Sequence, residues 1–120
     1  MTTRLTIGSA TAMATLLDND TARDFASLLP LTVEMHDLFE REKPGPLPRA
    51  LSEGGEHKFS YEVGEMAYWP PANDLAIFYA DDGQRTIPRP GIIPLGRIES
   101  GLDVVAAAGD SFQLKIERTD

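Results

Sequence analysis

Two hydrophobic patterns occur along the chain, and the more common one has a period of two. Leu31, Val33 and Met35 are separated by polar residues, and Phe112 begins a similar alternation near the other end. Such alternation is typical of strands that bury one face. Seven strands are therefore expected: Arg4–Ile7 and Thr11–Leu17, which form a hairpin around Gly8-Ser9, Leu31–His36, two within Val63–Tyr79, Ile92–Ile98 and Phe112–Glu117.

Two short stretches show the helical period instead. The apolar face of the first consists of Ala22, Phe25, Ala26 and Leu29. Thr21 and Asp24 have the spacing of a capping box, which predicts that this helix begins at Thr21. Pro30 ends it, because proline cannot continue a helix. The second predicted helix is the one-sided segment Leu102–Ala106.

Prolines and glycines interrupt the remaining segments. Lys43–Gly55 is predicted to be either a long surface loop or an irregular strand broken by prolines. Asp81-Asp82-Gly83 predicts a turn, and Thr86–Gly91 a second proline-rich loop. About seven strands with little helix need a sandwich or a closed barrel to hide their edges. We expect a mostly β protein, with the two short helices covering the ends of a barrel.

Composition narrows the possible functions. The chain has 120 residues, which suits a single domain spanning residues 1–120. A net charge of −8 disfavours nucleic acid and anionic membranes as partners. The absence of cysteine excludes disulfides, thiolate metal sites and cysteine nucleophiles. The opening segment lacks the dense apolar centre of a signal peptide, so residence in a bacterial cytoplasm is expected.

Three segments resemble the cyclophilin family in their residues and in their order along the chain. Ala14–Pro30 resembles the family's strand, acidic turn and first helix. Val63–Tyr79 and Ile92–Glu117, the latter containing Gly101-Leu-Asp-Val-Val, resemble the second half of its barrel. The match is closest to small bacterial cyclophilin-like proteins, whose role is largely unassigned. The resemblance implies a closed antiparallel β-barrel of seven to eight strands with two short capping helices, and a groove on its flank.

The resemblance also implies candidate site residues. Arg49 lies roughly where the family has its catalytic arginine, and Phe78 matches an aromatic of the proline pocket. Leu47 and Pro48 replace the phenylalanine and histidine that precede this arginine. Glu53 stands before Gly54-Gly55 in place of a glutamine. An isomerase of this family would use the guanidinium to hold the twisted prolyl amide against an apolar wall.

Other patterns supply few further candidates. Tyr68-Trp69-Pro70-Pro71 is interpreted either as a rigid turn with packed aromatics, in which one proline has a cis bond, or as a ligand wall. Met66 precedes it on the same predicted strand. His36 and His57 have no second ligand at strand or helix spacing, so no metal site is predicted. No phosphate-binding loop or other cofactor motif occurs, and no cofactor is expected.

Three functional hypotheses follow. The first is a non-enzymatic or barely enzymatic barrel that binds a peptide or small molecule in a groove bordered by Arg49, Trp69 and Phe78, with Tyr68 and Met66 beside them. The second is a weak peptidyl-prolyl isomerase that uses Arg49. The third is a structural module that associates with itself through exposed strands.

Overall fold

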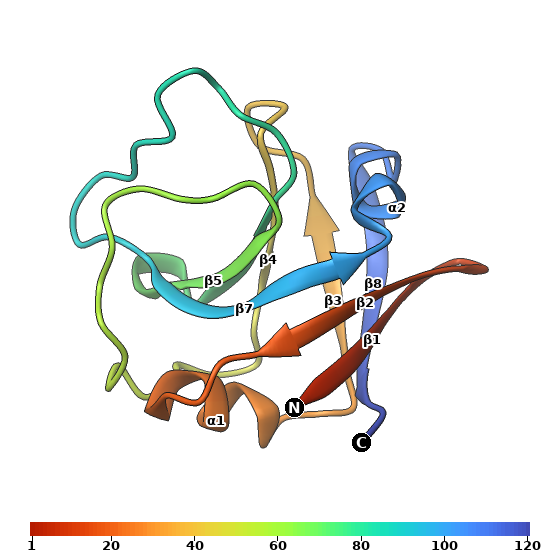
Figure 1. Cartoon of the computed structure of the whole chain (residues 1–120), viewed down its shortest axis with the longest axis horizontal. Coiled ribbons are helices and arrows are strands. Elements are labelled where there is room, and N and C mark those ends of the chain that lie inside the picture. The colour runs from red at the N-terminus through yellow and green to blue at the C-terminus, as the bar shows by residue number, and fades with distance from the viewer.

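The computed structural model describes residues 1–120 as eight strands and two α-helices (Figure 1). In chain order these are β1 (Thr2–Ile7), β2 (Ala10–Leu16), α1 (Asp20–Ala26), β3 (Leu31–His36), β4 (Glu42–Pro46), β5 (Glu65–Trp69), β6 (Asp74–Phe78), β7 (Ile93–Ser100), α2 (Leu102–Ala106) and β8 (Ser111–Arg118). A single 3-10 turn, Pro70–Ala72, joins β5 to β6. All seven expected strands are present, and β4 is the eighth.

The strands form one antiparallel sheet in the order β3-β8-β1-β2-β7-β5-β6-β4, which curls into a nearly closed barrel (Figure 1). The two end strands, β3 and β4, face each other across a seam without pairing. Gly45 of β4 makes this close approach possible. A Cβ atom at position 45 would lie 2.5 Å from the Glu34 carbonyl oxygen of β3. The expected barrel architecture is therefore confirmed, and the seam is the one place where two neighbouring strands are not hydrogen-bonded in a ladder.

The barrel interior is filled by alternate residues of the strands, as the period of two predicted. Leu5 of β1, Val33 of β3 and Ile116 of β8 are all at most 2% exposed. The helix α1 lies across one end of the barrel and adds Phe25 to the same core (Figure 1). Val105 of α2 belongs to this core as well. The two helices thus supply apolar residues to the interior from separate parts of the chain.

The start of α1 differs from the sequence prediction. Asn19 is the N-cap, and its Oδ1 accepts a hydrogen bond from the Ala22 backbone N–H at 2.8 Å. Thr21 is instead fully buried, and its Oγ1 accepts a hydrogen bond from the Gly55 N–H at 3.0 Å. The predicted capping box at Thr21 is therefore wrong, because this hydroxyl serves a long-range contact with the loop after β4. The helix ends before Pro30, as expected.

The segment Lys43–Gly55 contains both of the structures predicted for it, a proline-containing strand and a loop. Its first part belongs to β4, which contains Pro44 and Pro46 and pairs only with β6. A strand that pairs on one side tolerates proline, since the missing N–H can face away from the partner. The rest of the segment is irregular.

The cis peptide bonds precede Pro30 and Pro90, so neither Pro70 nor Pro71 has one.

No helix has the length and apolar character needed to cross a membrane.

Candidate functional site

The outer face of β4, β5 and β6 carries a second apolar surface. On β6, Leu75 and Ile77 point into the barrel core, whereas Ala76 and Phe78 belong to a separate buried cluster outside it. The members of this outer cluster are Tyr61, Ala67, Ala76, Phe78, Ile87 and Ile92, with Val63 and Trp69 packed against them. Both faces of these strands are therefore covered, the outer one by segments from the long connections.

Two connections, residues 47–64 and 79–92, cover this outer face and are joined to each other. The backbones of Lys58 and Ile92 exchange two hydrogen bonds, of 2.7 and 2.8 Å. Ile87 N–H donates to the Phe59 carbonyl at 2.8 Å. These bonds fix Ile87 and Ile92 against the outside of the barrel, so the proline-rich segment after β6 forms an ordered wall.

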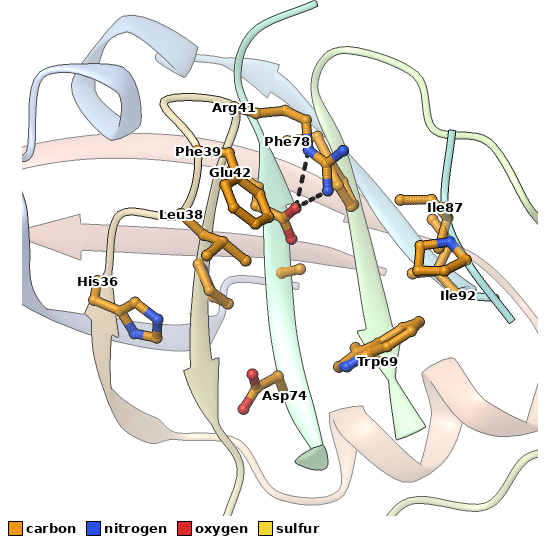
Figure 2. A pocket seen from close by; sticks show the side chains of 13 residues that line it. His36, Leu38, Phe39, Arg41, Glu42, Trp69, Asp74, Phe78, Ile87 and Ile92 are labelled. Carbon is orange, nitrogen blue, oxygen red and sulfur yellow. Dashed lines mark hydrogen bonds and ion pairs between the residues drawn. The ribbon is translucent and has the colours of Figure 1, made fainter. Parts of the chain in front are cut away.

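A cavity of about 220 Å³ lies between this wall and the turn that joins β3 to β4 (Figure 2). We call it the flank cavity. Apolar and aromatic side chains make up much of its lining, and its ionisable residues are His36, Arg41, Glu42 and Asp74. The complete lining is His36, Leu38, Phe39, Arg41, Glu42, Pro44, Trp69, Asp74, Ala76, Phe78, Ile87, Pro88 and Ile92.

The Arg41 guanidinium closes one end of the flank cavity. It lies 5.2 Å from the centre of the Tyr61 ring and 5.8 Å from that of Phe78, and these two rings stack with their centres 4.3 Å apart. Arg41 donates two hydrogen bonds to Glu42, one to Asp82 and one to the Thr86 carbonyl. Four of its five N–H groups are thus engaged, and the guanidinium fastens the wall segment to β4.

The turn above the cavity holds two residues in a conformation that they rarely adopt. Phe39 and Glu40 have φ of 60° and 52°, in the left-handed region that favours glycine. The Phe39 ring is 75% exposed at the rim of the cavity. Strained backbone of this kind is common where a side chain must be presented to a ligand.

Burial affects the acidic groups of the cavity differently. It raises the pKa of Glu42, although the Arg41 ion pair opposes this change. Burial also raises the pKa of Asp74, which accepts no hydrogen bond that would counter it. Outside the cavity, hydrogen bonds from the Arg85 and Gln84 backbone N–H groups and from Arg41 lower the pKa of Asp82 to about 2. Asp82 is therefore a stable anionic anchor for Arg41.

The residues proposed from the sequence occupy three separate places. Trp69 and Phe78 line the flank cavity. Tyr68 and Met66 alternate with Trp69 on β5 and lie in the barrel core, where they are at most 1% exposed. The Tyr68 hydroxyl donates to Asn73 Oδ1 at 2.8 Å, which holds the turn after β5.

Arg49 does not line the flank cavity. Its guanidinium donates hydrogen bonds to both Asp24 carboxylate oxygens, at 2.8 and 3.1 Å, and to Ser27 Oγ. These bonds tie the loop after β4 to α1, beneath the barrel. The structure thus brings Trp69 and Phe78 together and leaves Arg49 elsewhere.

Arg41, Asp74 and Phe39 line the cavity but are not among the site residues predicted from the sequence. For Asp74 the alternation on β6 was a usable signal. Asp74 and Phe78 are four residues apart, and in a strand this spacing places both side chains on the same face. Arg41 and Phe39 lie in an irregular turn, where no periodicity indicates direction. No group of three or more histidine, aspartate or glutamate side chains is placed to hold a metal ion.

Two solved structures share this architecture. The solution structure of the hypothetical protein AF2241 from Archaeoglobus fulgidus superposes with a TM-score of 0.78 at 21% identity, covering 99% of this chain and 95% of that one. The structure of McbB in complex with tryptophan gives a TM-score of 0.73 at 11% identity. That match covers 98% of this chain and only 44% of McbB. At these identities the likeness shows the fold alone.

A search of curated proteins found no match. The model of the cyclophilin-like family matches residues 5–117, nearly the whole length of the chain. This agrees with the resemblance seen in the sequence and with the nearly closed eight-stranded barrel. The chain therefore belongs to the cyclophilin-like family.

Proposed function

We propose that this chain binds a small organic molecule or a short peptide segment in the flank cavity. The observation that supports this function is the combination of an open cavity of about 220 Å³ with an ordered apolar lining. Ligand sites are typically concave and mostly apolar, with a few placed polar groups. The flank cavity has these properties, with Trp69 and Phe78 on its apolar side and Arg41 and Asp74 at its polar positions.

The cavity is supported by side chains that are already fixed. Phe78 is fully buried beneath it, and the Arg41 guanidinium is held by Glu42 and Asp82. A site built from ordered groups loses little conformational entropy when a ligand enters. By contrast, the exposed Phe39 ring at the rim is free to contact an occupant.

Backbone amide chemical-shift mapping tests this function directly. The wild-type chain is titrated with proline-containing peptides and with a panel of neutral, cationic and anionic metabolites. We expect shifts to concentrate at Ala76, Phe78 and Ile87 for at least one compound. If no compound in any class shifts these amides, the proposed function is wrong.

Two phenylalanine variants provide a matched control. Phe39 and Phe59 are both exposed, at 75% and 54%, but only Phe39 lines the cavity. Phe39→Ala is expected to weaken binding several-fold, whereas Phe59→Ala leaves it unchanged. Equal effects of the two substitutions would place the binding surface outside the flank cavity.

The second candidate is a weak peptidyl-prolyl isomerase that uses Arg49. One observation favours an isomerase, since a guanidinium does lie beside the stacked rings of Phe78 and Tyr61. It belongs to Arg41, however, and Arg49 would first have to release Asp24. A protease-coupled assay on an Ala-Pro peptide tests this function with wild type, Arg49→Ala and Arg41→Ala. Rates equal to the uncatalysed rate for all three proteins would eliminate the isomerase.

A further inference from the structure

The two carboxylates of the flank cavity have different partners. Glu42 is 9% exposed and forms an ion pair with Arg41. The Asp74 carboxyl has no hydrogen-bond or ion-pair partner, and the groups whose charges act across the cavity on it are the exposed His36 and the like-charged Glu42. Asp74 is nevertheless partly buried at the cavity wall. Burial of a charge without a partner is unfavourable, so this carboxylate is available to an occupant of opposite charge.

Arg41 does not compensate Asp74. Arg41 lies beside Phe78, and Phe78 is four residues from Asp74 along β6. At about 3.3 Å per residue, this spacing separates the two ends of the cavity by about 13 Å. Figure 2 shows Asp74 and the Arg41 guanidinium at opposite ends of the cavity. The Arg41 guanidinium is also engaged by Glu42, Asp82 and the Thr86 carbonyl, so its charge is compensated there and Asp74 has no cationic partner of its own.

Asp74 has an aromatic neighbour suited to a cation. Trp69 of β5 is its direct cross-strand partner, and both side chains line the cavity (Figure 2). Trp69 is half-buried, with Ile92 and Ile87 forming the adjacent wall. Tryptophan is the aromatic side chain that attracts cations most strongly. A carboxylate whose cross-strand neighbour is an indole ring, with an apolar wall next to them, matches an ammonium group attached to an apolar body.

We propose that the occupant of the flank cavity is a small organic amine in its cationic form. Its ammonium group binds Asp74 beside Trp69, and its apolar part lies against the wall formed by Ile87, Pro88 and Ile92. The inference rests on the proposed function and adds the charge and size of the ligand. The cavity volume of about 220 Å³ is below the range of about 300–1,000 Å³ of sites for drug-sized ligands, which favours a compact molecule. The net charge of −8 also attracts cations over anions.

Three probes of similar shape and different charge test the inference. These are 2-phenylethylamine, 2-phenylethanol and 3-phenylpropionate, added to the full chain at pH 7.5. Trp69 is the only tryptophan, so its fluorescence reports on the cavity alone. We expect the amine to bind at least about tenfold more tightly than the alcohol, as a charge-assisted hydrogen bond would give, and the carboxylate to bind most weakly. Added salt should weaken amine binding and leave alcohol binding unchanged.

Asp74→Asn and Asp110→Asn form the matched pair of variants. Both remove one negative charge, but Asp110 is exposed and does not line the cavity. Asp74→Asn is expected to reduce amine binding to the level of the alcohol, while Asp110→Asn retains the preference. An amide spectrum with unchanged dispersion verifies that each variant is folded.

The outcomes separate the inference from the proposed function. Equal or tighter binding of the alcohol or the carboxylate overturns the inference and supports the cavity as a ligand site. Retention of the amine preference in Asp74→Asn also overturns it. If N-acetyl-lysine amide binds more tightly than 2-phenylethylamine, the occupant is a basic peptide side chain and the choice of a free amine is wrong. If none of these probes binds, the inference fails, whereas the proposed function fails only when the wider panel shifts no cavity amide.

Discussion

Lys43 and Asp37 form a buried ion pair at the seam of the barrel, with 3.0 Å between Nζ and Oδ1 and only 3% of the lysine side chain exposed. Lys43 Nζ also donates to the Gly109 carbonyl at 2.7 Å and lies 4.9 Å from the centre of the Tyr79 ring. The pair therefore joins three segments, namely the turn after β3, the start of β4 and the turn between α2 and β8. These contacts bridge the seam where β3 and β4 share no ladder.

Replacement of Lys43 by methionine should destabilise the protein by about 3 kcal/mol, because it leaves Asp37 partly buried without its cation. Urea unfolding monitored by Trp69 fluorescence measures this change. Lys115→Met on β8 is the control, since that lysine is 54% exposed and should change stability by less than about 1 kcal/mol. Equal effects of the two substitutions would show that the seam does not depend on this pair.

Tyr79 makes the stability depend on pH in the alkaline range. Burial and the hydrogen bond from its hydroxyl to Asp37 raise the pKa of Tyr79 from 10.0 to about 12. A raised pKa in the folded state stabilises the protein below pH 10, and this contribution is lost as pH rises from 10 to 12. The free energy of unfolding of wild type should exceed that of Tyr79→Phe by about 2 kcal/mol at pH 8, and this difference should shrink toward pH 11.5. Urea midpoints at both pH values test this, and a constant difference would contradict it.

Gly45 allows β4 to pack against β3, and its replacement by alanine should open the seam. The added Cβ would lie 2.5 Å from a backbone oxygen of Glu34 and 2.5 Å from Met35 Sδ, so strands must move apart. Overpacking of this kind costs about 1–3 kcal/mol or more. Gly8→Ala has no atom within 4 Å and meets only the backbone strain of φ +60°. Thermal unfolding should therefore show a larger loss for Gly45→Ala, and the reverse order would falsify the close-packed seam.

The strands were predictable because their signals are local. Leu31–His36 and Phe112–Glu117 alternate in the sequence and alternate in burial in the structure. The strand β4 was harder to recognise, because prolines remove the usual signal and only its pairing with β6 keeps it extended. The N-cap was misassigned since Thr21 and Asn19 are both good capping residues, and a long-range bond to Gly55 decides between them.

The site was only partly predictable, for a related reason. Phe78 and Trp69 lie on strands, where alternation and resemblance both apply. Arg49 and Arg41 lie in irregular segments, and only the tertiary structure shows which guanidinium faces the cavity. Arg49 binds Asp24, and Arg41 lies against Phe78. Asp74 is the side chain that most affects the charge of a ligand. Its place beside Trp69 is set by the register of β5 with β6, which the sequence alone does not show.

The strained turn at Phe39 and Glu40 allows stability and binding to be separated. Both residues have positive φ, which costs about 1–2 kcal/mol for a side chain that bears a Cβ. Replacement by glycine removes this strain and adds entropy to the unfolded chain, which offsets about 0.4–1 kcal/mol of the gain. Phe39→Gly and Glu40→Gly should therefore each leave stability unchanged or raise it by about 0.5–1 kcal/mol.

The two variants should differ in binding. Phe39→Gly removes a ring at the cavity rim and should weaken binding of 2-phenylethylamine several-fold, whereas Glu40→Gly removes an exposed side chain that does not line the cavity. Urea unfolding and Trp69 fluorescence titration measure the two properties on the same samples. A large loss of stability in either variant would show that the left-handed turn is not strained. Unchanged binding by a stable Phe39→Gly variant would show that the exposed ring is not kept for a ligand.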